Sequence, residues 1–301
     1  MTSPNPLQLL RLFQKVAPAH YFYQLCQKHG YGFRQGVYTP MVVVWLMIWQ
    51  RLPGNQGLAA AVQYLLHGGA QDLLNDCKRC MQDEVSAAPG GYCQARQNLP
   101  KLIVSEVTDR IVEQLRPEMQ EGWKGLKRPV LVVDGTTVPL PHSTELVKAF
   151  PPGSNQHGEN HWPVMQMVVF HDVFSGLALR PSWGPMYGDG AVSEQELAEQ
   201  TLGRVPADGV VLGDGNFGIF YFAYKVQQSQ RQSILRLTQA RARKILGSEL
   251  TEGTDRKVVW QVSRWDRARH PELPEGCTVE GRLLVCANPS RTMAPRIWTT
   301  Q

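Results

Sequence analysis

Two aspartates follow short apolar runs and could together hold a divalent cation. Asp134 comes after residues 130–133 (Val-Leu-Val-Val), Asp214 comes after 210–213 (Val-Val-Leu-Gly), and a glycine follows each aspartate. Consecutive aliphatics without alternation are typical of a strand covered on both faces, and the carboxyl ends of such strands carry the chemistry of α/β sheets. If neighbouring strands bring the carboxylates to about 4 Å, their repulsion is on the order of 4 kcal/mol at an effective dielectric near 20. A shared proton or a bound cation would offset this repulsion, and hard oxygen ligands favour Mg²⁺ or Mn²⁺.

A plainer interpretation stands beside the metal site. The Asp-Gly dipeptide often only ends a strand and opens a turn, with no chemistry attached. For either aspartate alone the turn explains the pattern, whereas the pair favours a shared cation.

The elements that must position these aspartates follow from hydrophobic periodicity. The first 125 residues predict helices at 9–16, 41–49, 58–66, 73–81 and 102–115, the last ending before Pro117. Residues 126–245 predict strand 130–133, a hairpin of 164–170 with 176–180, helix 193–202 opened by a capping box, strand 210–212, helix 217–228 and strand 234–237. Residues 246–301 predict short β pieces at 257–262, 282–286 and 296–300.

The order of these elements predicts the fold class. We expect a helical N-terminal domain (1–125), then a ribonuclease-H-like mixed sheet with helices (126–245), then a β-rich insertion (246–301). In this order the first and fourth strands of the core carry Asp134 and Asp214.

Composition indicates a soluble globular protein. The chain has 301 residues, 43% of them hydrophobic, and its most apolar window, 41–49, is too short to span a bilayer. The first residues lack the charged start and apolar core of a signal peptide, so we expect no membrane association and a cytoplasmic location. The six cysteines are expected as reduced thiols, because the sequence has no secretion signal. Cys77, Cys80 and Cys93 suggest a zinc site but lack a fourth ligand at a familiar spacing, so ordinary helix and loop thiols are expected.

Basic residues are segregated along the chain, which favours a polyanionic partner such as DNA. No acidic residue precedes Asp72, and the net charge is +5. A second acid-free run, 225–248, contains the residues that we expect to contact DNA, which are Arg236, Arg241, Arg243 and Lys244. A solvated basic face is the alternative explanation of this run.

The loop 139–163 contributes further candidates. His157 and His161 could orient a phosphate or a metal ion, although a hydrogen-bonded loop histidine is the commoner case. Trp162 and Trp183 are expected to pack, with base stacking as the alternative.

Several segments resemble the DDE transposases of bacterial insertion sequences, specifically the IS-four group. They are 92–100 (Tyr-Cys-Gln-Ala-Arg-Gln-Asn-Leu-Pro), 133–137 (Val-Asp-Gly-Thr-Thr), 190–198 (Gly-Ala-Val-Ser-Glu-Gln-Glu-Leu-Ala), 211–218 (Val-Leu-Gly-Asp-Gly-Asn-Phe-Gly) and 235–237 (Leu-Arg-Leu). The resemblance covers about residues 85–240, and its sharpest motif is Asp214 followed three positions later by Phe217.

This resemblance implies a site and a reaction. Asp134 and Asp214 match the first two of three carboxylates that hold two Mg²⁺ or Mn²⁺ ions, with Phe217 as an accessory residue. The implied activity is cleavage at the ends of a mobile element and transfer of the 3′-hydroxyl strands to target DNA. It also implies a homodimer or higher assembly on DNA, in a bacterial cytoplasm and on the nucleoid.

The sequence departs from the family at the third carboxylate. The family's glutamate lies in the pattern Y-x2-R-x3-E-x6-K, and here the tyrosine with a correctly spaced arginine, Tyr31, has Tyr38 in the glutamate position. The printed sequence stops at Gln301 within the β-rich region, so we expect a chain truncated before this glutamate and inactive alone. The alternatives are a DNA-binding remnant that competes or dimerises with the full-length transposase, and an unrelated metal-dependent phosphodiesterase.

Overall fold

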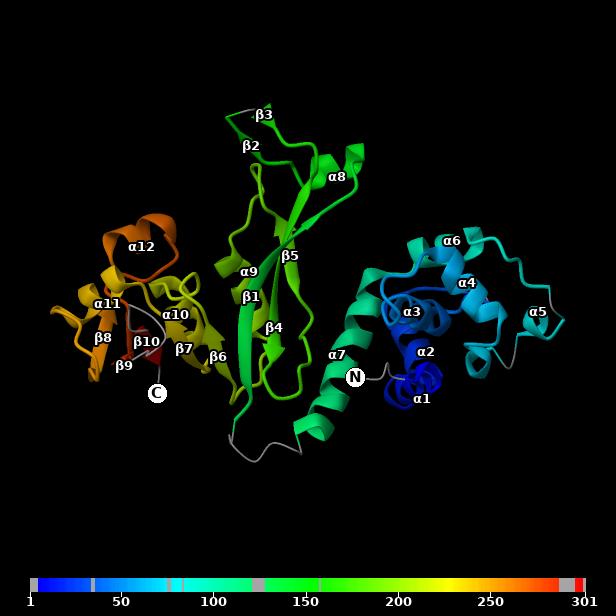
Figure 1. Cartoon of the computed structure of the whole chain (residues 1–301), viewed down its shortest axis with the longest axis horizontal. Coiled ribbons are helices and arrows are strands. Elements are labelled where there is room, and N and C mark those ends of the chain that lie inside the picture. Colours follow the sequence, from blue (N-terminus) through cyan, green and yellow to red (C-terminus); the bar gives the residue numbers. More distant parts are fainter. Residues whose placement is uncertain are drawn as a thin grey trace. The chain divides into compact units, whose positions relative to one another are not determined.

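The computed structural model describes residues 5–33, 36–74, 77–82, 84–120, 128–156, 158–286 and 296–299. The chain divides into two compact units, Met1–Glu118 and Met119–Gln301. The first is helical and the second is built on a sheet (Figure 1).

Helices form the first unit. They are α1 (Pro6–Val16), α2 (Ala19–Lys28), α3 (Pro40–Trp49), α4 (Leu58–Leu66), η1 (Gln71–Leu73), α5 (Lys78–Met81), α6 (Gly90–Asn98) and α7 (Lys101–Gln120). Helix α3 is the centre of the core, because seven of its ten residues are buried. Its start combines a proline in the first turn with the Thr39 hydroxyl, which accepts from the Val42 N–H. The Tyr92 hydroxyl donates to Gln50 Oε1 at 2.8 Å inside this core, and burial raises the pKa of Tyr92 to about 12.

Two helical predictions in this unit are wrong in detail. Helix α7 continues through Pro117 to Gln120 instead of ending before the proline. A proline removes one backbone hydrogen bond, and this close to the helix end the disruption is confined to the last turns. The helix expected at 73–81 is divided into η1 and α5, since Cys77 has an extended backbone (φ −90°, ψ 104°).

The second unit contains an eight-stranded sheet in the order β5-β4-β1-β6-β7-β10-β9-β8. The strands are β1 (Val130–Pro139), β4 (Val164–Asp172), β5 (Ser182–Pro185), β6 (Val210–Gly213), β7 (Gln232–Arg236), β8 (Asp255–Gln261), β9 (Thr278–Val285) and β10 (Arg296–Thr299). Strands β5, β4 and β1 are antiparallel neighbours, whereas β1, β6 and β7 run parallel. These five strands form the mixed sheet of a ribonuclease-H-like α/β fold, as predicted.

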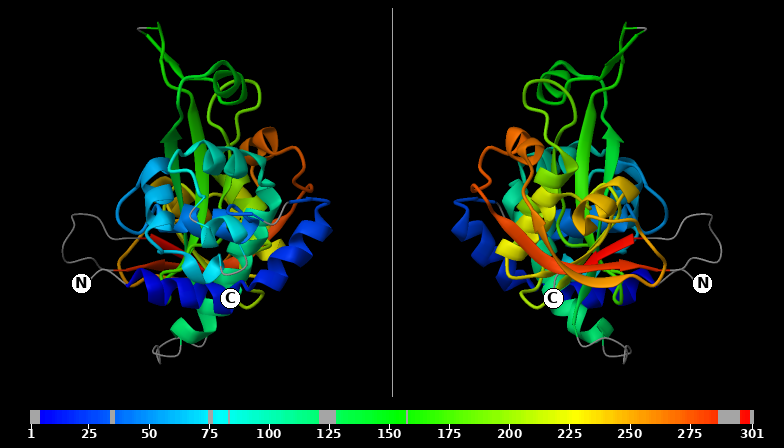
Figure 2. Two further views of the ribbon diagram at one scale, coloured as in Figure 1. Left: turned by 90° about the vertical axis from the view of Figure 1, so that its right-hand side faces the viewer. Right: turned by 90° about the vertical axis from the view of Figure 1, so that its left-hand side faces the viewer.

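The C-terminal β strands extend this same sheet. Strand β10 pairs antiparallel with both β7 and β9, and β9 pairs with β8. Figure 2 shows β8 and β9 side by side in orange. Helix α11 (Gln239–Leu246) packs on β8. Helix α12 (Arg264–Arg269) lies between β8 and β9 in the sequence.

One face of the core sheet is buried under helices. Helix α9 (Glu194–Leu202) packs on β4 and β5, and α10 (Phe220–Gln228) packs on β7. The predicted capping box of α9 is present, with Ser193 and Glu196 exchanging hydrogen bonds. Along β1, Leu131 and Val133 are buried on this face, while Asp134 is exposed.

The segment after β1 forms an arm beyond the sheet (Figure 1). It contains α8 (Thr144–Ala149) and the small hairpin of β2 (Ser154–Asn155) and β3 (Gly158–Glu159).

A carboxylate connects α2 with α7 in the first unit and makes this unit sensitive to pH. Lys28 Nζ donates to both Glu106 oxygens at 2.9 and 2.8 Å, and His29 Nε2 lies 2.8 Å from Oε1. The hydrogen bond from Lys28, opposed in part by burial, lowers the pKa of Glu106. Because the folded-state pKa is the lower one, the ionised carboxylate stabilises the fold above its unfolded pKa, and this contribution disappears as pH falls through the folded pKa.

We therefore expect Glu106→Gln to reduce the free energy of unfolding at neutral pH by less than about 1 kcal/mol, because Lys28 is largely exposed. The difference from the unchanged chain should vanish once the pH has fallen below the folded-state pKa of Glu106, in thermal unfolding followed across pH. Glu113→Gln, on the exposed side of the same helix, is the matched control. A deficit that persists at low pH would contradict the electrostatic explanation.

Candidate functional site

The register of three parallel strands brings Asp134 and Asp214 to the same level. Strands β1 and β6 pair from Val130↔Val210 to Val133↔Gly213, so the aspartates are the next residue on each. Neighbouring strands lie about 4.8 Å apart. On the next strand Gly213 pairs with Leu235, so that Arg236 follows at the same level. Two acidic residues and one arginine thus occupy consecutive positions across the sheet.

Asp134 lies in the middle of its strand, not at the strand end that we predicted. Strand β1 continues to Pro139 because its other edge pairs with β4 from Leu131↔Asp172 to Pro139↔Val164. Pairing with β6 does stop at Val133, one residue before the aspartate. Side chains alternate along a strand, so Asp134 points away from the face that buries Val133.

One oxygen of each aspartate accepts a hydrogen bond from a backbone N–H nearby in the chain. Asp134 Oδ1 accepts from the Gly135 N–H and Asp214 Oδ1 accepts from the Asn216 N–H, both at 2.9 Å. Within the described part of the chain, no residue donates to Oδ2 of either side chain. Both side chains are exposed, which leaves these oxygens accessible to a cation.

The donor set fits a partly hydrated hard cation. Among the described residues no group of three or more His, Cys, Asp or Glu side chains is arranged to hold a metal ion. Mg²⁺ in phosphoryl-transfer sites often uses only one or two carboxylates and completes its shell with water and substrate phosphate. Asp134 and Asp214 suit a site of this kind, in which one or two carboxylates share the cation with water and phosphate.

Sequence reasoning missed a third acidic residue, which lies beside Gly135 of β1 and the turn that follows β6. Glu194 begins α9, and its carboxylate accepts from the Asn216 side-chain amide. The neighbouring Gln195 Nε2 donates to the Asn216 carbonyl at 2.9 Å. A Cβ on Gly135 would collide with the Glu194 carboxylate, so this glycine permits the approach. The sequence contained no signal for this contact beyond the small residues that follow each aspartate.

Phe217 belongs to the core. It is 1% exposed, and its ring lies 5.4 Å from that of Phe222. A Cβ on Gly213 would come within 2.8 Å of the Phe217 Cβ, so the turn that carries Asp214 packs tightly on the end of β6. Phe217 therefore anchors this turn from the buried side.

The four basic candidates differ in their surroundings. Arg241 is partly buried and donates to the Gly218 carbonyl, and burial lowers its pKa while Asp266 raises it. Arg236, Arg243 and Lys244 are exposed, and Arg243 Nη2 lies 2.9 Å from Glu249 Oε2. Arg241 thus connects α11 to the turn after β6, and the other three are accessible to a large anion.

A groove of about 730 Å³ lies beside α11. Its lining includes Lys244, Trp260 and Trp265. Trp265 is 66% exposed, and the Arg264 guanidinium lies 4.9 Å from its ring centroid. This surface offers both positive charge and an aromatic plane.

The histidines of the arm lie away from the aspartates. His161 stacks on His142, with ring centroids 4.4 Å apart, and Trp162 meets His161 edge-on. The five steps along the strand from Asp134 to Pro139 span about 17 Å before the arm begins. His157 lies outside the described residues.

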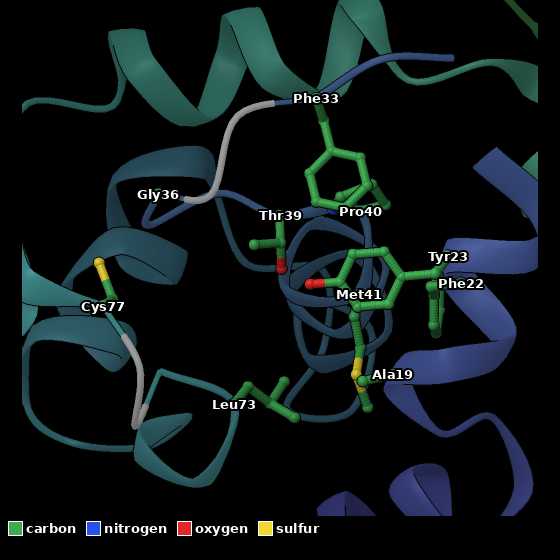
Figure 3. A pocket seen from close by; sticks show the side chains of 10 residues that line it. All are labelled: Ala19, Phe22, Tyr23, Phe33, Gly36, Thr39, Pro40, Met41, Leu73 and Cys77. Carbon is green, nitrogen blue, oxygen red and sulfur yellow. The ribbon is translucent and has the colours of Figure 1, made fainter. Parts of the chain in front are cut away.

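The first unit contains an apolar pocket of about 140 Å³ (Figure 3). The rings of Phe22, Tyr23 and Phe33 lie on one side, with Leu73 and Cys77 opposite. None of the described residues that line this pocket carries a carboxylate. Burial, with Cys77 nearby, raises the pKa of Cys80 to about 12, which keeps that thiol protonated.

Comparison of the sequence with protein-family models and with curated proteins finds no match. Within the described residues, the helices are all too short or too polar to cross a membrane. Among solved structures, the chain is similar to a piggyBac transposase in a synaptic complex with hairpin DNA, at a TM-score of 0.38 and 10% sequence identity. The match covers 98% of this chain and 60% of that transposase chain.

Proposed function

We propose that the second unit carries a divalent-cation site for phosphodiester chemistry on DNA, of the transposase type. The observation that supports this proposal is the register of β1 and β6, which makes Asp134 and Asp214 the next residues after the paired ends Val133 and Gly213. Two exposed carboxylates at neighbouring positions repel each other, and a hard cation between them removes this repulsion.

The chain's own residues have separate tasks in this proposal. Asp134 and Asp214 would hold the cation through Oδ2, which in both side chains accepts from no described residue. When bound, the cation polarises a phosphate oxygen and acidifies a water. Arg236, at the next position across the sheet, neutralises the charge of the bound phosphate.

The sequence resemblance supports the finer part of the proposal. We infer that the substrates are element ends and target DNA, that two Mg²⁺ or Mn²⁺ ions take part, and that the protein acts as a dimer or higher assembly on DNA. Within the described residues no third ligand joins the aspartate pair, so we expect weak or no strand cleavage by this chain alone. The same observation favours the second candidate function, a protein that binds DNA at these surfaces without cutting it.

Replacing either aspartate tests the cation site. Asp134→Asn and Asp214→Asn should each weaken Mn²⁺ affinity by more than about tenfold, because an amide oxygen is a poorer ligand for a hard cation than a carboxylate. Electron paramagnetic resonance titration of free Mn²⁺ measures this affinity on the full chain. Asp208→Asn removes an exposed aspartate of the same unit and should have no effect. Equal affinity in all four proteins would refute the two-aspartate site.

Salt dependence tests the DNA surface. Arg236→Ala, Arg243→Ala and Lys244→Ala should each lower the slope of log affinity against log salt by about 0.9, the value for one phosphate contact on duplex DNA. Fluorescence anisotropy with a labelled duplex measures the slope. Arg241→Ala is the matched contrast: it should lower the melting temperature and leave the slope unchanged, because its guanidinium bonds to Gly218. Three unchanged slopes would move the DNA surface elsewhere.

A further inference from the structure

The first turn of α9 reaches the turn that follows β6. Helix α9 begins at a fixed point, because the Glu196 carboxylate accepts from both the Ser193 N–H at 2.7 Å and the Ser193 hydroxyl at 2.9 Å. This capping box places Glu194 and Gln195 in the first helical turn, and both contact Asn216. The contact spans 21 or 22 positions of sequence, so only the fold creates it.

Asn216 connects the first turn of α9 with Asp214. Its side-chain amide donates to Glu194, its carbonyl accepts from Gln195, and its own N–H donates to Asp214 Oδ1 at 2.9 Å. Two contacts from a helix therefore fix the residue whose N–H orients the Asp214 carboxylate. Without them, a turn containing Gly215 would sample many backbone conformations and the aspartate would be ordered only on binding.

The Glu194 carboxylate also lies against Gly135, next to Asp134 in the chain. Side chains alternate along β1, so Gly135 is on the face of Val133 and Asp134 points to the opposite face. Glu194 therefore approaches β1 from the face opposite the Asp134 carboxylate. This placement agrees with the lack of any three-membered metal group among the described residues.

We propose that Glu194 is a positioning residue, which through Asn216 holds the Asp214 carboxylate in the orientation that binds the cation. The inference rests on the proposed cation site and adds to it a residue that orients one of the cation ligands. The connection is a charge-assisted hydrogen bond from the Asn216 amide to the Glu194 carboxylate.

Mn²⁺ affinity of the full chain tests this role, with two substitutions at one position. Glu194→Ala should weaken Mn²⁺ binding about tenfold, because losing a group that orients a metal ligand typically has an effect of this size. Glu194→Gln should restore affinity to within about twofold, because its amide oxygen still accepts from Asn216. Asn216→Ala should match Glu194→Ala, and the double variant should be no weaker than either, since both break one connection.

Two further variants separate position from folding and from charge. Gly135→Ala should displace the Glu194 carboxylate, because the added Cβ would collide with it. The variant should therefore weaken Mn²⁺ binding although the Glu194 side chain is still present. Glu252→Ala removes one exposed negative charge elsewhere in the unit and should change nothing. Melting temperatures of all variants show whether a loss of affinity reflects unfolding.

The outcomes distinguish this inference from the proposed function. If Glu194→Gln is as weak as Glu194→Ala, the charge itself matters and the positioning role is refuted. If Asp134→Asn and Asp214→Asn lose affinity while Glu194→Ala does not, the cation site stands and this inference fails. If the unchanged chain does not bind Mn²⁺, both fail.

Discussion

The pairing of β1 with β6 is the constraint on which the site depends. Parallel hydrogen bonds match Val133 with Gly213, and this match sets Asp134 and Asp214 at one level although 80 positions separate them in the sequence. A slip of one residue would turn one set of side chains to the other face of the sheet. The register is secured by burial, since Leu131, Val133 and Val211 are almost wholly inaccessible to solvent. Burial of apolar strands thus positions two charged groups.

Small residues let the supporting elements approach the aspartates closely. Gly135 admits the Glu194 carboxylate, and Gly213 admits the turn that ends at Phe217. A Cβ on Gly218 would collide with the Arg236 carbonyl, and the Gly218 carbonyl accepts from Arg241. The glycines around the second aspartate therefore serve packing as well as turning. This explains why a helix, a strand and a turn converge on a stretch as short as 213–218.

The basic residues of the acid-free run 225–248 differ in burial, and this difference gives them different roles. The Arg241 guanidinium is partly withdrawn from water and connects α11 with the core, whereas Arg236 lies exposed at the level of the aspartates. Lys244 and the exposed Trp265 line a groove between α11 and the C-terminal strands, which extend the core sheet through β10. A polyanion that contacts Arg236 and Lys244 would follow these neighbouring elements.

The sequence alone predicted the type and order of the main core elements and singled out the two aspartates as candidates, because apolar periodicity and an Asp-Gly pair after an apolar run are local signals. It predicted α3, α4 and the capping box of α9 almost to the residue. It could not show that β1 runs on past Asp134, since that length depends on pairing with β4. Nor could it separate Arg241 from its exposed neighbours or place Glu194 against Gly135 and Asn216. These features arise from contacts between segments distant in sequence, which only the tertiary structure decides.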